Sequence, residues 1–191
     1  MEQNKAITVY CASSPDAPEV FLNAAYELGR ELARAGFGSV TGAGRTGLMG
    51  QVVRGSLEAG GEAIGVIPQF MVDRGWANPQ MTRLHVTADM AERKKLLADL
   101  GAGAIALPGG LGTLDELMDL LTQCQLGLYH NPVVILNVDG FYDNLLRQLE
   151  HADSCRMMRH FDLPGNLWQV ALTPEQAVSF FLSTFLPPPH Q

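Results

Sequence analysis

The chain has 191 residues, of which 47 % are hydrophobic and 17 % are charged, so it has the length of one domain and too much apolar content for a disordered polymer. Its 20 Asp and Glu residues exceed its 13 Lys and Arg residues, for a formal net charge of −7, which argues against a general binder of nucleic acid or of anionic membranes. No stretch approaches the roughly 20 apolar residues of a membrane span, and the N-terminus lacks the pattern of a signal peptide.

The hydrophobic pattern predicts a regular alternation of strands and helices. In chain order we expect strand 6–10, helix 21–35, a strand near 39–40, helix 48–59, strand 63–67, loop 69–80, strand 84–86, helix 90–100, strand 104–107, a helix ending near residue 129, strand 133–138, helix 141–150, strand 169–172 and a last helix. Thr173 is the expected N-cap of that last helix, and Pro174 suits its first turn. Several strands are continuously apolar, which is typical of a parallel sheet covered on both faces. We therefore predict one doubly wound, Rossmann-like α/β domain over residues 1–191, with about seven mostly parallel strands and helices on both faces.

Cysteine and histidine usage gives no sign of a metal site. The three cysteines are odd in number and show no CxxC spacing, and the histidines are scattered. This usage fits a reduced, cytoplasmic protein without disulfides or bound zinc.

Two glycine-rich loops follow predicted strands, at the edge of the sheet where such folds bind ligands. The first, Gly42-x-Gly44-x-x-Gly47, has the spacing of a dinucleotide fingerprint, but it follows the second strand, and Glu62 opens the next strand instead of closing it. A dinucleotide loop and a tight turn with close helix–strand packing both stay open. Ser14, after the first strand, either donates to a ligand or completes a turn.

The second loop, Pro108-Gly109-Gly110-Leu111-Gly112-Thr113, joins a buried strand to a helix. Its glycines allow backbone N–H groups to approach a ligand closely, and together with the helix dipole they form an anion site for a phosphate or phosphoribosyl group. The Thr113 hydroxyl adds a further donor. The tetrad Thr113-x-x-Glu116 also matches a capping box, in which the glutamate only satisfies the helix N-terminus.

The helical period separates the charged residues of this helix. A buried stripe is expected from Leu117, Leu121, Cys124 and Leu128. Asp115 points away from that stripe and Glu116 lies at its border, so Glu116 is the carboxylate expected to face a cleft.

The preceding helix carries Arg93 in the middle of its apolar arc, with Lys94 at the flank. An arginine turned toward the core requires an acidic or anionic partner. That partner is either a structural ion pair or, beside a glycine-rich anion loop, a ligand or Glu116.

These segments resemble the Lonely Guy family of cytokinin riboside 5′-monophosphate phosphoribohydrolases, often described as lysine decarboxylase-like. The resemblance covers about residues 7–138 and is carried by four segments, which are Thr41–Gly50, Met90-x-x-Arg93-Lys94, Pro108-Gly-Gly-x-Gly-Thr-x-x-Glu116 and Gln125-Leu126-Gly127. It implies a cofactor-independent enzyme that hydrolyses the N-glycosidic bond of AMP or N6-substituted AMP to free base and ribose 5-phosphate.

Carried over by position, the resemblance makes Arg93 and Glu116 catalytic. The substrate-binding residues are then expected to be Ser14, Gly44, Lys94, Gly109, Gly110, Leu111, Gly112, Thr113 and Thr122. The family also forms dimers, and Thr122, which lies away from the buried stripe, would serve a site shared across a homodimer. The partners expected are this nucleotide and a second copy, with no nucleic acid and no membrane.

The chain departs from the family pattern at three places. Ala43 lies within a segment where three consecutive glycines are common, and Ala12 stands where glycine is frequent. Some members bind substrate through a glutamate after the third strand, where this chain has Gly75 with Asp73 as the nearest acid. These departures concern base preference more than the reaction.

Two other functions compete with hydrolysis. A nucleotide-binding or carrier protein would use the same glycine loop and Arg93 without turning the ligand over. A pyridoxal-phosphate decarboxylase needs a Schiff-base lysine, for which Lys5, Lys94 and Lys95 are the only choices. Lys5 precedes the fold and Lys95 faces solvent, so this last function is disfavoured.

Overall fold

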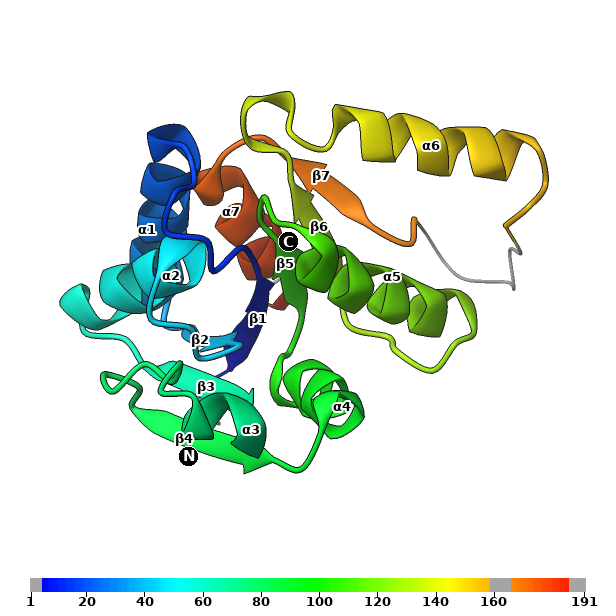
Figure 1. Cartoon of the computed structure of the whole chain (residues 1–191). Helices are drawn as coiled ribbons and strands as arrows, with labels where there is room; N and C mark the ends of the chain where they lie inside the picture. The colour runs from blue at the N-terminus through cyan, green and yellow to red at the C-terminus, as the bar shows by residue number, and fades with distance from the viewer. Residues whose placement is uncertain (1–4, 159–165, 186–191) are drawn as a thin grey trace.

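Seven parallel strands form one continuous sheet through the centre of the protein (Figure 1). The computed structural model describes residues 5–158 and 166–185. The strands are β1 (Ala6–Tyr10), β2 (Gly38–Thr41), β3 (Ala63–Pro68), β4 (Arg83–Thr87), β5 (Ala104–Ala106), β6 (Val133–Leu136) and β7 (Gln169–Ala171). Their order is β4-β3-β2-β1-β5-β6-β7, and every neighbouring pair is parallel. The predicted doubly wound α/β architecture is confirmed.

The strand order reverses direction beside β1, because the chain builds outward to β4 on one side and then returns to add β5 on the other. In open α/β sheets, ligands bind at the carboxyl ends of the strands on either side of such a reversal. The loops after β1, β2 and β5 are therefore the first place to look for a site.

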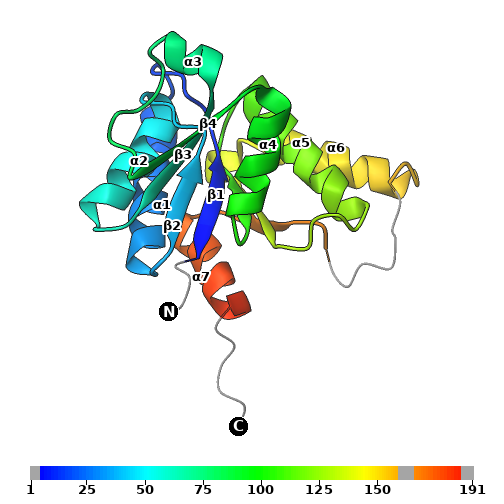
Figure 2. The ribbon, with the colours of Figure 1, turned by 90° about the horizontal axis from the view of Figure 1, so that it is seen from below.

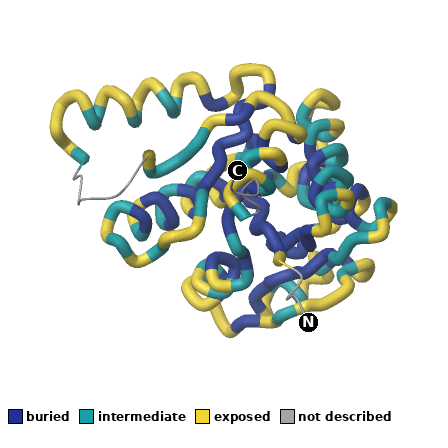
Figure 3. Tube along the Cα trace, turned by 180° about the vertical axis from the view of Figure 1, so that it is seen from behind, coloured by how far each residue is buried: buried dark blue, intermediate teal, exposed yellow. Residues whose placement is uncertain are grey.

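Helices cover both faces of the sheet. They are α1 (Glu19–Arg34), α2 (Gly47–Glu58), α3 (Gln69–Asp73), α4 (Met90–Leu100), α5 (Leu111–Gln125), the 3₁₀ turn η1 (Val138–Gly140), α6 (Asp143–Ser154) and α7 (Pro174–Phe185). Figure 2 shows α1, α2 and α7 on one face and α4, α5 and α6 on the other. Strand residues alternate between these layers: Ile7 and Val9 pack with the first group, and Ala6 and Tyr10 with the second. The central strands are buried, whereas α6 contains no buried residue (Figure 3).

Helices α1 and α2 touch backbone to backbone through two glycines. A Cβ on Gly29 would lie 2.2 Å from the carbonyl oxygen of Val52, and one on Gly55 would lie 2.1 Å from that of Tyr26. Glycine in a helix normally costs about 1 kcal/mol relative to alanine. Here that cost is offset by close packing that no other residue permits.

Three differences from the sequence prediction have a clear local cause. The loop expected over 69–80 contains α3, which is missed because five residues, none of them buried, are too few to show a hydrophobic period. The strand expected to reach residue 138 ends at Leu136, because the Asn137 side chain accepts from the Tyr142 N–H and donates to Asp143, turning the chain there.

The helix expected to reach residue 129 ends at Gln125. Gly127 has φ +68°, and the N–H groups of Gly127 and Leu128 bond back to Cys124 and Gln123, which is a Schellman C-cap. Leu128 is consequently 70 % exposed, so its assignment to the buried stripe is wrong. The predicted N-cap of α7 is confirmed, since Thr173 Oγ1 accepts from the Gln176 N–H.

Within the described ranges, no helix is both long and apolar enough to cross a membrane.

We expect Gly29→Ala to destabilise the fold by about 1–3 kcal/mol, since an added methyl group must push two helix backbones apart. Helix propensity alone predicts the opposite, namely that alanine in place of glycine stabilises the helix. The matched control is Gly112→Ala, also within a helix but with open space at the Cβ position. Urea unfolding of both variants provides the measurement, and equal stability of the two would contradict the packing argument.

Candidate functional site

A pocket of about 650 Å³ opens at the carboxyl ends of the central strands. Its walls come from the loops after β1, β2 and β5, from the start of α2, and from α3 to α5. The lining residues are Cys11, Ala12, Ser13, Ser14, Gly42, Gly44, Arg45, Thr46, Met49, Ile67, Met71, Trp76, Met90, Arg93, Gly110, Gly112, Thr113 and Glu116. The pocket thus lies at the reversal of strand order, where the topology places a ligand.

The amino terminus of α5 forms one end of the pocket. Gly110 is the N-cap, so the N–H groups of the next three residues have no partner within the helix. Gly110, Gly112 and Thr113 all line the pocket, which matches the anion site expected there. Since Gly110 and not Thr113 occupies the N-cap, the capping-box interpretation of Thr113-x-x-Glu116 is wrong.

Gly109 and Leu111 lie next to this anion site but do not line the pocket. A Cβ on Gly109 would lie 2.1 Å from Thr113 Oγ1, so glycine at this position leaves room for the threonine hydroxyl. The Leu111 side chain is 87 % exposed and points away from the pocket, which leaves only its backbone available to a ligand.

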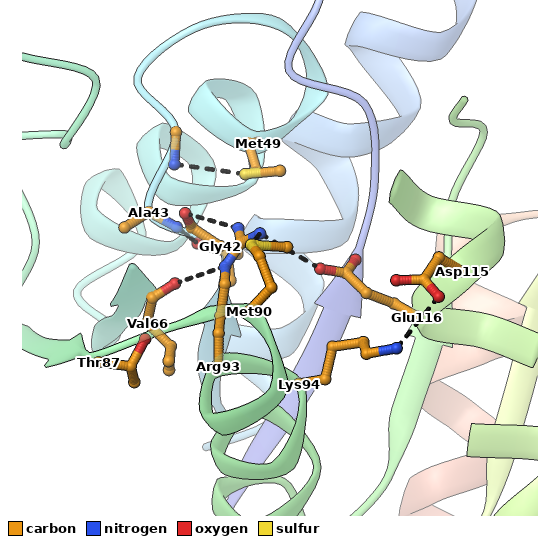
Figure 4. Close-up of polar contacts among 12 residues, drawn as sticks. Gly42, Ala43, Met49, Val66, Thr87, Met90, Arg93, Lys94, Asp115 and Glu116 are labelled. Atoms are coloured by element: carbon orange, nitrogen blue, oxygen red, sulfur yellow. Dashed lines mark hydrogen bonds and ion pairs between the residues drawn. The ribbon is translucent and has the colours of Figure 1, made fainter. Parts of the chain in front are cut away.

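Arg93 is buried and held by the ends of two strands (Figure 4). Its Nε donates to the carbonyl oxygen of Val66 in β3 at 3.1 Å, and its Nη2 donates to that of Gly42 after β2, also at 3.1 Å. A Cβ on Gly42 would lie 2.0 Å from Nη2, so the glycine is required for this arrangement. The prediction from the helical period that Arg93 faces inward is confirmed.

Glu116 lies beside Arg93 in the wall of the pocket. Its Oε1 lies 3.7 Å from Arg93 Nη1, and only 7 % of the residue is exposed. Burial raises the pKa of Glu116 to about 7, and the attraction of Arg93 offsets that rise only in part. A carboxyl group with a pKa near neutrality can take up and release protons at physiological pH. Asp115 is exposed, so the sequence argument chose the right carboxylate of the two.

Lys94 and Thr122 lie outside the pocket in this single chain. Lys94 Nζ pairs with Asp115 at 3.1 Å (Figure 4) and with Asp119 at 3.7 Å, and these carboxylates raise its pKa. Thr122 is exposed and its hydroxyl donates to the carbonyl of Met118.

The loop Gly42–Gly47 forms a tight turn against the loop after β1. Gly47 has φ +61°, and a Cβ there would lie 2.5 Å from the carbonyl oxygen of Ser14. Thr46 Oγ1 donates to the carbonyl of Ser13 at 2.7 Å. Ser14 and Gly44 both line the pocket, and the tight-turn interpretation of the glycine motif describes this geometry.

Sequence reasoning missed the apolar lining. Met49, Met71 and Met90 come from three different helices, and Trp76 follows α3. None of these residues carries a motif, and the sequence alone left open whether Trp76 lies over a site or packs within its loop. Their convergence depends on tertiary structure.

Within residues 5–158 and 166–185, no group of three or more His, Cys, Asp or Glu side chains is placed to hold a metal ion. Cys11, Cys124 and Cys155 are free thiols.

Comparison with known proteins agrees with the motifs. Residues 49–180 match the family described as "Possible lysine decarboxylase". A cytokinin riboside 5′-monophosphate phosphoribohydrolase from Rhodococcoides fascians is 42 % identical over 149 residues, which span 78 % of this chain and 75 % of that protein. The probable cytokinin riboside 5′-monophosphate phosphoribohydrolase LOGL5 from Oryza sativa subsp. japonica is 35 % identical over 186 residues, or 97 % of this chain and 74 % of that protein.

Among solved structures, the molybdenum cofactor binding protein from Rippkaea orientalis superimposes with a TM-score of 0.74 at 24 % identity, covering 97 % of this chain and 99 % of that one. At this identity the likeness shows that the two share a fold. The family match over most of the sequence and the identity to the two phosphoribohydrolases show that the chain belongs to the Lonely Guy family.

Proposed function

We propose that this protein hydrolyses the N-glycosidic bond of purine nucleoside 5′-monophosphates, AMP or N6-substituted AMP, to free base and ribose 5-phosphate. The observation that carries the proposal is the buried Glu116–Arg93 pair, which faces a pocket whose other end is the amino terminus of α5. The names of the family relatives, cytokinin riboside 5′-monophosphate phosphoribohydrolases, support the same substrate class.

The 5′-phosphate binds at the amino terminus of α5. The N–H groups of Leu111, Gly112 and Thr113 supply hydrogen bonds, and the helix dipole favours the anion. Such a site needs no lysine, which explains how an acidic chain can hold a phosphate.

Glu116 is the general base. In its ionised form it takes a proton from water as the water oxygen bonds to C1′ of the ribose. The electron pair of the C1′–N bond leaves with the base, which takes up a proton from solvent. The ionised carboxylate also stabilises the positive charge that develops on the ribose, as in glycoside hydrolysis. Arg93 orients Glu116 and binds ribose or phosphate.

The lysines do not support pyridoxal-phosphate chemistry, despite the description of the family. Lys94 is paired with Asp115, Lys95 with Asp99, and the ammonium of Lys5 lies over the ring of Phe185. None of the three lines the pocket, so none is placed to form a Schiff base there.

We also propose a cytoplasmic homodimer. Thr122, Leu126 and Leu128 lie exposed at the carboxyl end of α5 and just beyond it, where a second copy could cover the leucines and use Thr122 at a shared site. The free thiols support a reducing compartment.

We expect the purified protein to have twice the mass of the chain by light scattering. Replacing Leu128 with aspartate is expected to shift it toward monomer, since a charge buried in an apolar contact weakens association. Unchanged dimerisation in this variant would place the interface elsewhere.

Replacing Glu116 with glutamine is expected to lower base release by about 10²-fold or more, the scale of a general-base contribution, while AMP binding is retained. Free adenine is quantified by chromatography after incubation with AMP. Asp115→Asn is the matched control and should keep nearly full turnover. Full activity of Glu116→Gln would refute the mechanism, and AMP binding by the unmodified protein without any base release would identify a nucleotide-binding protein instead.

The raised pKa of Glu116 also predicts how stability depends on pH. The folded state binds a proton at Glu116 up to about pH 7, whereas the unfolded chain releases it near pH 4.5, so this group lowers stability as pH rises from 4.5 to 7. Glu116→Gln removes that penalty. The melting temperature of Glu116→Gln minus that of the unmodified protein should therefore be larger at pH 8 than at pH 4.5. The expected increase is about 2–10 °C, the equivalent of about 1–3 kcal/mol.

The control for this measurement is again Asp115→Asn, which removes an exposed carboxyl group from the same helix and leaves Glu116 in place. A melting-temperature difference between Glu116→Gln and the unmodified protein that does not vary with pH would show that Glu116 titrates normally.

A further inference from the structure

We propose that Trp76 is the surface on which the nucleobase of the substrate stacks, and that this contact contributes to binding of the base and not of the phosphate. The proposal rests on the proposed function, because it assumes a nucleotide in the pocket. Trp76 lines the pocket and is 47 % exposed. A half-exposed tryptophan in the wall of a pocket offers a large, flat, apolar face to a ligand.

The order of the strands gives the direction in which the nucleotide extends. The phosphate site follows β5, whereas Trp76 follows β3 and α3. Three strand spacings separate β5 from β3 in the order β3-β2-β1-β5, or about 14 Å. The guanidinium of Arg93 is bonded at the ends of β2 and β3 and faces Glu116. The bond to be cleaved therefore lies between the phosphate site and Trp76, so the base extends toward the tryptophan.

The rim around Trp76 is built to hold the indole in place. The backbone N–H of Trp76 donates to the carbonyl of Met71 at 3.1 Å. The guanidinium of Arg74 lies 5.2 Å from the Trp76 ring and 5.4 Å from that of Phe70, a cation–π arrangement that orients all three side chains. The next residue, Ala77, forms an antiparallel bridge with Gly44, which fixes the rim to the glycine loop.

The surroundings of Trp76 are suited to a planar apolar group. Ile67, Met49, Met71 and Met90 line the pocket with it. Methionine side chains are flexible and polarizable, so they adapt to ligands of different shape. Stacking tolerates any base because every base presents a π-face. The indole and this apolar wall together suit a large aromatic base.

Fluorescence offers a direct test, because Trp168 is the other tryptophan of the chain and packs in the core cluster with α4, α5 and α6. In the Glu116→Gln, Trp168→Phe variant, Trp76 is the sole tryptophan, and substrate is consumed about 10²-fold more slowly during a titration. AMP is expected to quench its emission in a saturable manner, and ribose 5-phosphate, which lacks the base, is expected to leave it unchanged. Equal quenching by both ligands, or by neither, would overturn the proposal.

Kinetics separate a stacking role from a structural one. Trp76→Ala should raise KM for AMP by about tenfold, the order expected for loss of one base–aromatic stack, with a smaller change in kcat. Inhibition by ribose 5-phosphate should be unaffected, and Trp76→Phe should recover most of the loss. Trp168→Phe is the matched control. If Trp76→Ala weakened the binding of ribose 5-phosphate as much as that of AMP, the tryptophan would only support the rim.

If the unmodified protein released no base at all, the proposed function would fail. The AMP titration would still decide whether Trp76 contacts the base.

Discussion

A buried guanidinium must be surrounded by acceptors, and this requirement for Arg93 organises the site. Removing a charge from water is costly unless polar groups replace the lost hydration. Here the carbonyl oxygens of Val66 and Gly42 do so, both at 3.1 Å. The site therefore depends on β2 and β3 ending side by side in the correct register and on the absence of a side chain at Gly42.

The same arrangement explains why Glu116 keeps a raised pKa beside an arginine. An adjacent cation normally favours the ionised carboxylate. The guanidinium of Arg93 already donates to the carbonyl oxygens of Val66 and Gly42. Its nearest nitrogen lies 3.7 Å from Glu116, beyond a normal hydrogen bond. Desolvation is thus the larger effect, and the pKa of the carboxyl group rises to about 7. A tighter ion pair would stabilise the fold and would leave a weaker base.

Local periodicity was sufficient to predict part of this site. The helical period placed Arg93 inward and chose Glu116 over Asp115, because both conclusions depend only on residues within one helix. The alternation of apolar runs likewise predicted the sheet and its covering helices. The sequence could not predict that Arg93 would be held by backbone carbonyls of two strands, since a carbonyl acceptor has no side-chain signature. It also could not reveal the apolar wall of Met49, Met71 and Met90, which comes from three separate helices.

The glycine loop connects Arg93 to the rim around Trp76. The carbonyl of Gly42 accepts from Arg93, and the carbonyl of the next residue, Ala43, accepts from the N–H of Asn78 in the rim that follows Trp76. Ala43 has φ +59° and is fully buried. A left-handed alanine is tolerated only where its surroundings over-determine it. Adjacent peptide groups thus hold both the arginine and the rim, so a shift of the loop that disturbs one is expected to disturb the other.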